Sequence, residues 1–216
     1  MAHIHLEDGS FTLIWVLVWW TCALLIIGIV LYLLRSKKTP GTGTITIAAF
    51  LTATSFAIFQ VSLPFFGGVH LNLTPVIGIL AGPFLGTLIV FIVNILSAAI
   101  GHGGWGLIGA NVLVNVSEVV VAWVTYRGLK KITPGLFYRA GIATFAGLFT
   151  GNIVMILIIL VSGIQGATQS AYMTLLGLSG LAAVNMGVAV VEAIITGLVV
   201  TYIGRMRPDL IGGGSS

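Results

Sequence analysis

The sequence contains very little charge. Only 6% of its 216 residues are Asp, Glu, Lys or Arg, and 58% are hydrophobic, whereas a soluble domain carries roughly 25% charged residues. A single cysteine, Cys22, excludes an intramolecular disulfide. The G-x-x-x-x-G-K-[ST] phosphate loop is missing, as are H-E-x-x-H and G-x-S-x-G. These absences argue against a soluble domain, against ATP hydrolysis by this chain and against an enzyme.

Long apolar runs take the place of charge. A helix needs about 20 mainly apolar residues to cross a bilayer. We therefore predict an all-α, polytopic membrane protein with seven transmembrane helices, one of them short, over residues 11–34, 44–63, 72–81, 83–100, 105–126, 138–161 and 172–204. No polar linker divides the chain, so residues 1–209 are expected to form one transmembrane domain that begins with the segment 1–10. Residues 210–216 are read as a linker- or tag-like tail.

The nine Lys and Arg residues predict the orientation of the helices. They form three clusters, which contain Arg35, Lys37, Lys38, then Arg127, Lys130, Lys131, Arg139, and finally Arg205, Arg207. With the amino terminus outside and seven crossings, all nine fall on the inner face, as the positive-inside rule requires. If segment 72–81 did not cross, two clusters would change sides. The net charge of +4 is thus a topology signal, and we expect no nucleic-acid partner.

The same alternation places all four histidines on the outer face. These are His3, His5, His70 and His102, and the acids Glu7 and Asp8 join them there. Neutral imidazole is the commonest protein ligand for metals, so four histidines from three loops favour a transition-metal site. The alternatives are a helix cap or a hydrogen bond to a loop carbonyl for His102, and a solvated side chain for His5.

The amino terminus adds further nitrogen donors. A free α-amine has a pKa of about 8, so it can lose its proton and bind a metal together with the next amide nitrogen and a nearby imidazole. Donors from consecutive residues close small planar rings, and planar nitrogen coordination favours Ni²⁺ or Cu²⁺. Such a site offers no carboxylate or thiolate, so Ca²⁺, Mg²⁺ and structural zinc fit it poorly.

Three motifs resemble one transporter family. HIHLEDGSF, GGVHLNLTPVIGILAGPFLGTLI and GHGGWGLIGANVLVN are similar to the NikM/CbiM family, the substrate-binding (S) components of energy-coupling-factor (ECF) nickel and cobalt transporters. The resemblance implies high-affinity capture of Ni²⁺, or of Co²⁺, as the transported substrate at the outer face of a prokaryotic plasma membrane, with no catalytic cofactor. It also implies ATP-driven import with a transmembrane coupling subunit and two cytosolic ATPases.

The resemblance also implies a ligand set. In the family the amino-terminal segment folds back into the bundle, and the amine, the amide and imidazole of a histidine, and the histidine of the GxHL corner form a planar site. These histidines correspond to His3 and His70, with His5 and His102 as neighbours that orient the ligands. One departure is Ala2, which separates Met1 from His3. If Met1 is retained, residues 1–3 supply four nitrogens. If Met1 is removed, Ala2 becomes the terminus, and the histidine then follows the first residue directly, as in the family.

Several interpretations stay open. A metal-responsive membrane sensor, cobalt-specific transport for cobalamin synthesis and an intramembrane metalloenzyme are the alternatives to nickel import. Glu118 and Glu192 fall within predicted helices, where interhelical hydrogen bonds with neighbouring asparagines are favoured over a proton relay. Glycines spaced by four, at Gly78, Gly82 and Gly86, predict close helix packing, either within the chain or against the coupling subunit.

Overall fold

The protein is a bundle of six assigned α-helices. The computed structural model describes residues 8–36, 42–60, 62–63, 69–71, 73–133, 135–166, 168 and 170–208. The helices in this part of the chain are α1 (Leu13–Ser36), α2 (Thr42–Phe59), α3 (Thr74–Ala99), α4 (Ile108–Gly128), α5 (Leu136–Ser162) and α6 (Ala171–Met206). Five of them are long and apolar enough to cross a membrane, and the apolar part of α2, Ile45–Phe59, is shorter. The prediction of an all-helical, multi-pass membrane protein is confirmed, whereas the count of seven helices is not.

The difference in count comes from α3. This element joins two helical segments across Gly82, whose φ of 76° and ψ of 178° are not helical, and Pro83 follows directly. A Cβ on Gly78 would collide with the carbonyl oxygen of Val119, and one on Gly86 would lie 2.8 Å from Val119 Cγ1. Both segments of α3 therefore pack against the same level of α4, on either side of the break at Gly82. They correspond to the predicted segments 72–81 and 83–100.

That packing also answers one open question about the glycines. Gly78 and Gly86 both face Val119, so this spacing brings two segments of one chain together. Close packing within the chain is therefore the role that the structure supports for these two residues, and docking against another subunit stays a prediction.

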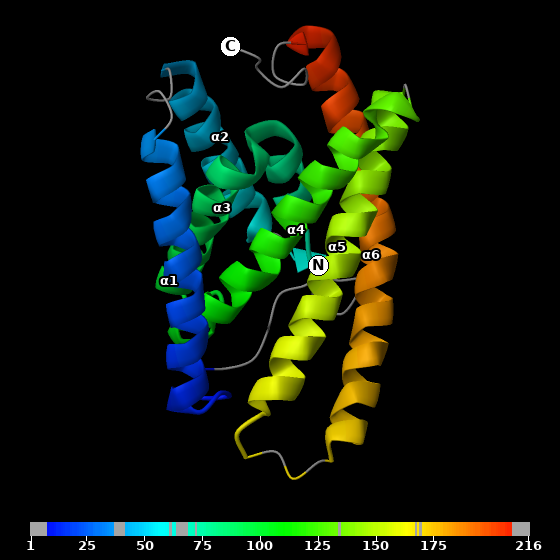
Figure 1. The fold of residues 1–216 in the computed structure, drawn as a ribbon. Helices are drawn as coiled ribbons and strands as arrows, with labels where there is room; N and C mark the ends of the chain where they lie inside the picture. The colour runs from blue at the N-terminus through cyan, green and yellow to red at the C-terminus, as the bar shows by residue number, and fades with distance from the viewer. Residues whose placement is uncertain are drawn as a thin grey trace.

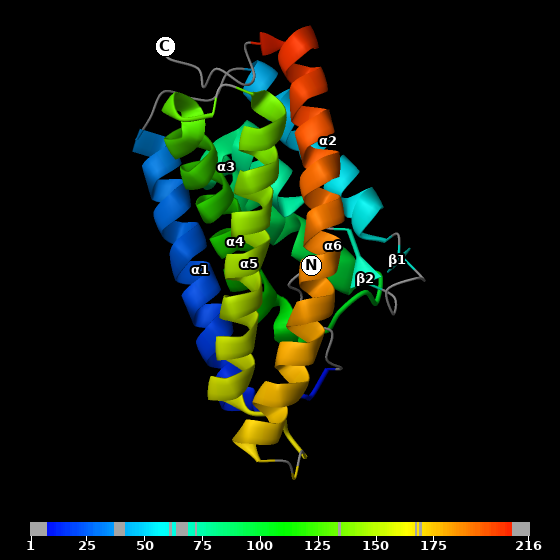
Figure 2. The same ribbon diagram turned by 90° about the vertical axis from the view of Figure 1, so that its right-hand side faces the viewer.

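Both views of the bundle place the carboxyl ends of α1, α4 and α6 at one end (Figures 1 and 2). The amino-terminal ends of α1 and α4, and the connection between α5 and α6, point the other way. We call the first the basic end, because it carries the described basic residues Arg35, Arg127, Lys130, Lys131, Arg139, Arg205 and Arg207. Their gathering at one end agrees with the predicted inner face, and the side of the membrane remains a prediction.

Several buried polar residues lie on α4, α5 and α6. Glu118 and Glu192 are 0% and 3% exposed, as expected of carboxyl groups within the bundle. Gly151 leaves room for the Glu118 side chain, since a Cβ there would overlap its carboxyl group. Asn185 Nδ2 donates to Asn152 Oδ1 at 3.0 Å, so an asparagine pair links α5 and α6.

Asn94 does not follow that pattern. Its Nδ2 donates 2.8 Å to the carbonyl oxygen of Val90, one turn earlier in the same helix. This donor of Asn94 therefore bonds within α3 and does not link two helices.

Candidate functional site

The predicted metal ligands lie mostly at the amino terminus. Met1, Ala2, His3 and His5 are outside the described residues. The backbone of His70 is described, and His102 is described with its side chain, which is half-buried. Among the described side chains, no three His, Cys, Asp or Glu residues come together. The predicted ligand set, which takes most of its donors from residues 1–5, therefore stays a prediction.

His70 lies in a short strand pair. β1 (Ser62–Leu63) pairs antiparallel with β2 (Val69–His70), so that Ser62 lies opposite His70. α2 ends at Phe59 and β1 begins at Ser62. α3 starts at Thr74 with a proline in its first turn. Proline is well suited to the first helical turn because no N–H is required there. The backbone at His70 is thus held between the end of α2 and the start of α3.

His102 lies in the turn that joins α3 to α4. Its N–H donates 2.9 Å to the carbonyl oxygen of Ser97, and Gly101 and Gly103 on either side adopt φ values of 81° and 90°, which favour glycine. The imidazole packs edge-on against Phe59, with ring centroids 4.9 Å apart and planes at 70°. Because Phe59 ends α2, just before β1, His102 packs against the segment that leads into the strand pair of His70.

Asp8 connects the amino-terminal segment to the same turn. Its carboxylate accepts hydrogen bonds from the N–H groups of Trp105, at 3.1 Å, and Gly106, at 2.9 Å. These N–H groups open η2 (Trp105–Leu107), which leads directly into α4. Helix N-termini leave N–H groups without helical partners and favour negative charge. Gly104, the residue before η2, has no side chain that could cap it, so Asp8 acts as the cap from 97 residues away.

Gly104 is fitted to this carboxylate. A Cβ at Gly104 would overlap the Asp8 carboxyl group, and one at Gly106 would lie 3.3 Å from Asp8 Oδ1. The same turn and Asp8 line an open hollow of about 520 Å³. Asp8 was predicted among the outer acids, and its role as a cap was not predicted. The available signal was GHGGWG, a glycine-rich start to a helix with no Ser, Thr, Asp or Asn to cap it.

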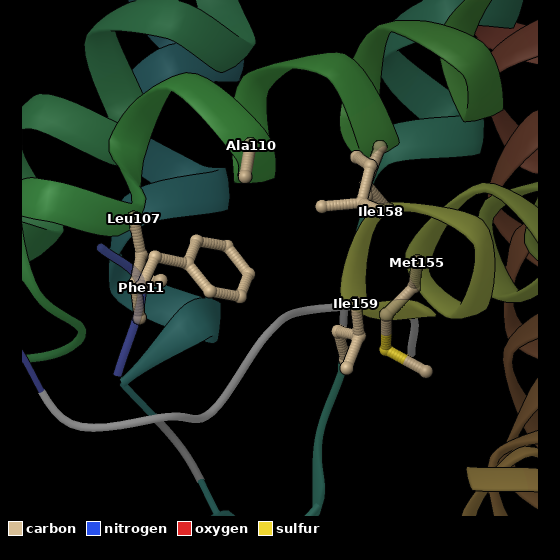
Figure 3. Close-up of a cluster of buried hydrophobic side chains, with 7 residues drawn as sticks. Phe11, Leu107, Ala110, Met155, Ile158 and Ile159 are labelled. Carbon is tan, nitrogen blue, oxygen red and sulfur yellow. The ribbon is translucent and has the colours of Figure 1, made fainter. Parts of the chain in front are cut away.

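Phe11 fixes the segment a second time. Its side chain is 3% exposed and lies in an apolar cluster with Leu107, Ala110, Val114, Met155, Ile158 and Ile159. Figure 3 shows the ring between the residues of the α4 region and those of α5. Next to it, the carbonyl oxygen of Ser10 accepts a 2.8 Å hydrogen bond from the N–H of Gln165. Residues 8–11 are therefore held by η2, α4 and the end of α5.

Comparison with known proteins identifies relatives along nearly the whole chain. A family model described as "Cobalt uptake substrate-specific transmembrane region" matches residues 5–210. "Cobalt transport protein CbiM" of Carboxydothermus hydrogenoformans is 28% identical, over 94% of this chain and 84% of that protein. The "Putative fused nickel transport protein NikMN" of Archaeoglobus fulgidus is 27% identical, over 96% of this chain and 68% of that protein.

One solved structure shares the fold. A crystal structure titled as that of a transition metal transporter superposes with a TM-score of 0.80 at 17% identity, over 94% of this chain and 93% of the other. At this identity the likeness concerns the arrangement of the helices. It supports the bundle described above as a known architecture.

Proposed function

The chain belongs to the CbiM family of metal-uptake transmembrane proteins, and from this membership we propose that it captures Ni²⁺, with Co²⁺ as the alternative substrate, for import. Members of this family are transport components and not enzymes, as the sequence predicted. The ion is the substrate and no catalytic cofactor is required. Capture takes place away from the basic end, where the amino-terminal segment meets the turn that contains His102.

The double anchoring of residues 8–11 is the observation that carries this proposal. Asp8 is bonded to the start of η2 and Phe11 is buried between α4 and α5. His3 precedes Asp8 by five residues, and an extended chain spans at most about 3.3–3.6 Å per residue, so His3 stays within about 18 Å of Asp8. A short tether of this kind keeps the terminal donors near the bundle and raises their effective concentration there.

We assign the ligands as the sequence predicted them. The α-amine, a backbone amide and the imidazole of His3 bind the ion in one plane, and the imidazole of His70 completes the plane when Ala2 is the terminus. When Met1 is retained, residues 1–3 supply four nitrogens and His70 becomes redundant. Four nitrogen donors in a plane suit Ni²⁺.

His102 and His5 have supporting roles in this proposal. The imidazole of His102 packs on Phe59 at the end of α2, just before the strand pair that contains His70. Groups around the ligands commonly hold a metal-binding imidazole in one orientation. Loss of either supporting histidine should weaken metal binding less than loss of His3 or His70.

Import needs partners that supply energy, because the chain has no phosphate-binding loop. We propose a transmembrane coupling subunit and two cytosolic ATPases, as in energy-coupling-factor transporters. The basic end, which we place in the cytosol, is the end that faces the ATPases. Metal uptake by cells that express the full set of subunits should stop when this chain is left out and return when it is restored.

Cobalt is the second candidate substrate, because the matching family is described by cobalt uptake. Isothermal titration with Ni²⁺ and with Co²⁺, on the chain starting at Met1 and on the chain starting at Ala2, separates the two ions and the two registers. We expect the form that starts at Met1 and the form that starts at Ala2 to differ in affinity. His3→Ala should abolish tight binding in both forms, whereas His70→Ala should abolish it in the form that starts at Ala2. His5→Ala, the same change at a supporting histidine, should weaken binding less than either. Unchanged binding in both His3→Ala and His70→Ala would refute the assigned ligands.

A further inference from the structure

A small enclosed cavity lies between α2, α3 and α4, next to the turn that contains His102. Its polar lining comes from Ser55 of α2, from Thr74, Asn94 and Ser97 of α3, and from Asn115 of α4. Phe59 and apolar side chains of α3 close the rest. The space open to the centre of a water molecule is about 10 Å³, and a buried water needs roughly 10–15 Å³ on this measure. The cavity is therefore the size of one water molecule.

Three oxygen atoms from three helices meet at this cavity. Ser55 Oγ, Ser97 Oγ and Asn115 Oδ1 have no hydrogen-bond partner within the described part of the chain. Their residues are only 6%, 1% and 4% exposed, respectively. Buried polar atoms in native proteins are almost always hydrogen-bonded to protein or to ordered water. Their convergence on one lining points to a shared partner inside the cavity.

We propose that this cavity binds a single ordered water molecule that links α2, α3 and α4. An amide oxygen only accepts hydrogen bonds, whereas a serine hydroxyl both donates and accepts. A water molecule can donate to Asn115 Oδ1 and exchange hydrogen bonds with both serines, which gives the three bonds that are typical of buried waters. The described lining holds no carboxylate, thiolate or imidazole, so its chemistry does not suit a divalent transition metal.

The proposed water lies next to the turn that contains His102. Ser97 accepts the His102 N–H through its carbonyl oxygen, and Phe59 packs against the His102 ring. Both residues also line the cavity. The water thus holds the end of α2 against α3 and α4 directly behind the His102 turn. This inference uses no metal, so it stands or fails independently of the proposed transport function.

Synchrotron radiolysis of the detergent-solubilised full chain in ¹⁸O-labelled water tests the proposal. X-rays generate hydroxyl radicals from bound water, and these oxidise neighbouring side chains with the ¹⁸O label, which mass spectrometry detects. Phe59 and Phe11 are matched probes, because they are 4% and 3% exposed, while Phe11 lies in the apolar cluster. We expect Phe59 to be labelled several-fold faster than Phe11. Equal rates in the wild-type chain would overturn the proposal.

Two variants sharpen the result. Asn115→Leu replaces the accepting amide with an apolar group of similar size, and should lower the labelling of Phe59 to the rate of Phe11. Asn185→Leu removes another buried asparagine, which bonds to Asn152 elsewhere in the bundle, and should leave Phe59 labelling unchanged. Labelling of Phe59 that persists in Asn115→Leu would overturn the proposal. The proposal would also be overturned if Phe59 labelling fell when potassium in the buffer is replaced by sodium, because a cation would then occupy the cavity.

Discussion

Removal of the Asp8 carboxylate should weaken metal binding without unfolding the bundle. The carboxylate accepts hydrogen bonds of 3.1 and 2.9 Å from the first N–H groups of η2. Loss of a capping side chain costs about 0.5–2 kcal/mol, and we take the middle of that range because Asp8 is exposed and water can replace part of the interaction. A loss of about 1 kcal/mol in the anchored state corresponds to roughly a fivefold rise in Kd.

Isothermal titration of Asp8→Ala with Ni²⁺ measures this effect, and thermal unfolding followed by circular dichroism checks the bundle. Asp8→Asn retains the shape of the side chain and one acceptor oxygen, so it should fall between wild type and Asp8→Ala. An unchanged Kd in Asp8→Ala would refute the claim that this anchor positions the terminal donors.

Gly104→Ala tests the same anchor from the other partner. A Cβ there overlaps the Asp8 carboxyl group, so this variant should weaken binding by a similar factor. Because both changes break one interaction, the double variant Asp8→Ala with Gly104→Ala should lose no more than the worse single variant. Gly128→Ala is the control, since a Cβ at Gly128 meets nothing within 4 Å. Additive losses in the double variant would show that Gly104 acts through something other than Asp8.

Two further variants test the packing that supports the anchor and the bundle. Phe11→Ala removes a side chain that is 3% exposed and should lower the free energy of unfolding, measured by denaturant titration in detergent, by about 3–5 kcal/mol. The control Phe50→Ala, at a position that is 68% exposed, should lower it far less. Equal losses would contradict the burial of Phe11. Gly78→Ala places a Cβ against the carbonyl oxygen of Val119, and overpacking of this kind costs about 1–3 kcal/mol or more. The melting temperature of this variant should therefore drop. Gly187→Ala, whose new Cβ meets nothing within 4 Å, should melt like wild type.

The sequence predicted those parts of the fold that depend on composition along the chain. Apolar runs marked the helices, and the spacing of Lys and Arg predicted that the basic residues gather at one end. Buried positions for Glu118 and Glu192 followed from the cost of charge within a bilayer. The break after segment 72–81 was also visible, because Gly82 and Pro83 interrupt the helical pattern.

Contacts between distant residues could not be predicted in the same way. The bond between Asp8 and Trp105 joins residues 97 positions apart, and neither local sequence indicates its partner. The placement of Gly78 and Gly86 on Val119 depends on the break in α3 at Gly82, whose geometry the spacing alone does not determine. For the candidate site, the ligand types came from the sequence, and the structure supplied the anchor at residues 8–11, which we propose keeps the terminus near the bundle.

X-ray absorption spectroscopy of the Ni²⁺ complex, with and without His70→Ala, tests the central claim most directly. For the chain that starts at Ala2, we predict a planar nickel ion with four nitrogen donors, one of which is replaced by water in His70→Ala. A six-coordinate ion bound mainly by oxygen, or a spectrum that is identical in His70→Ala, would contradict the account.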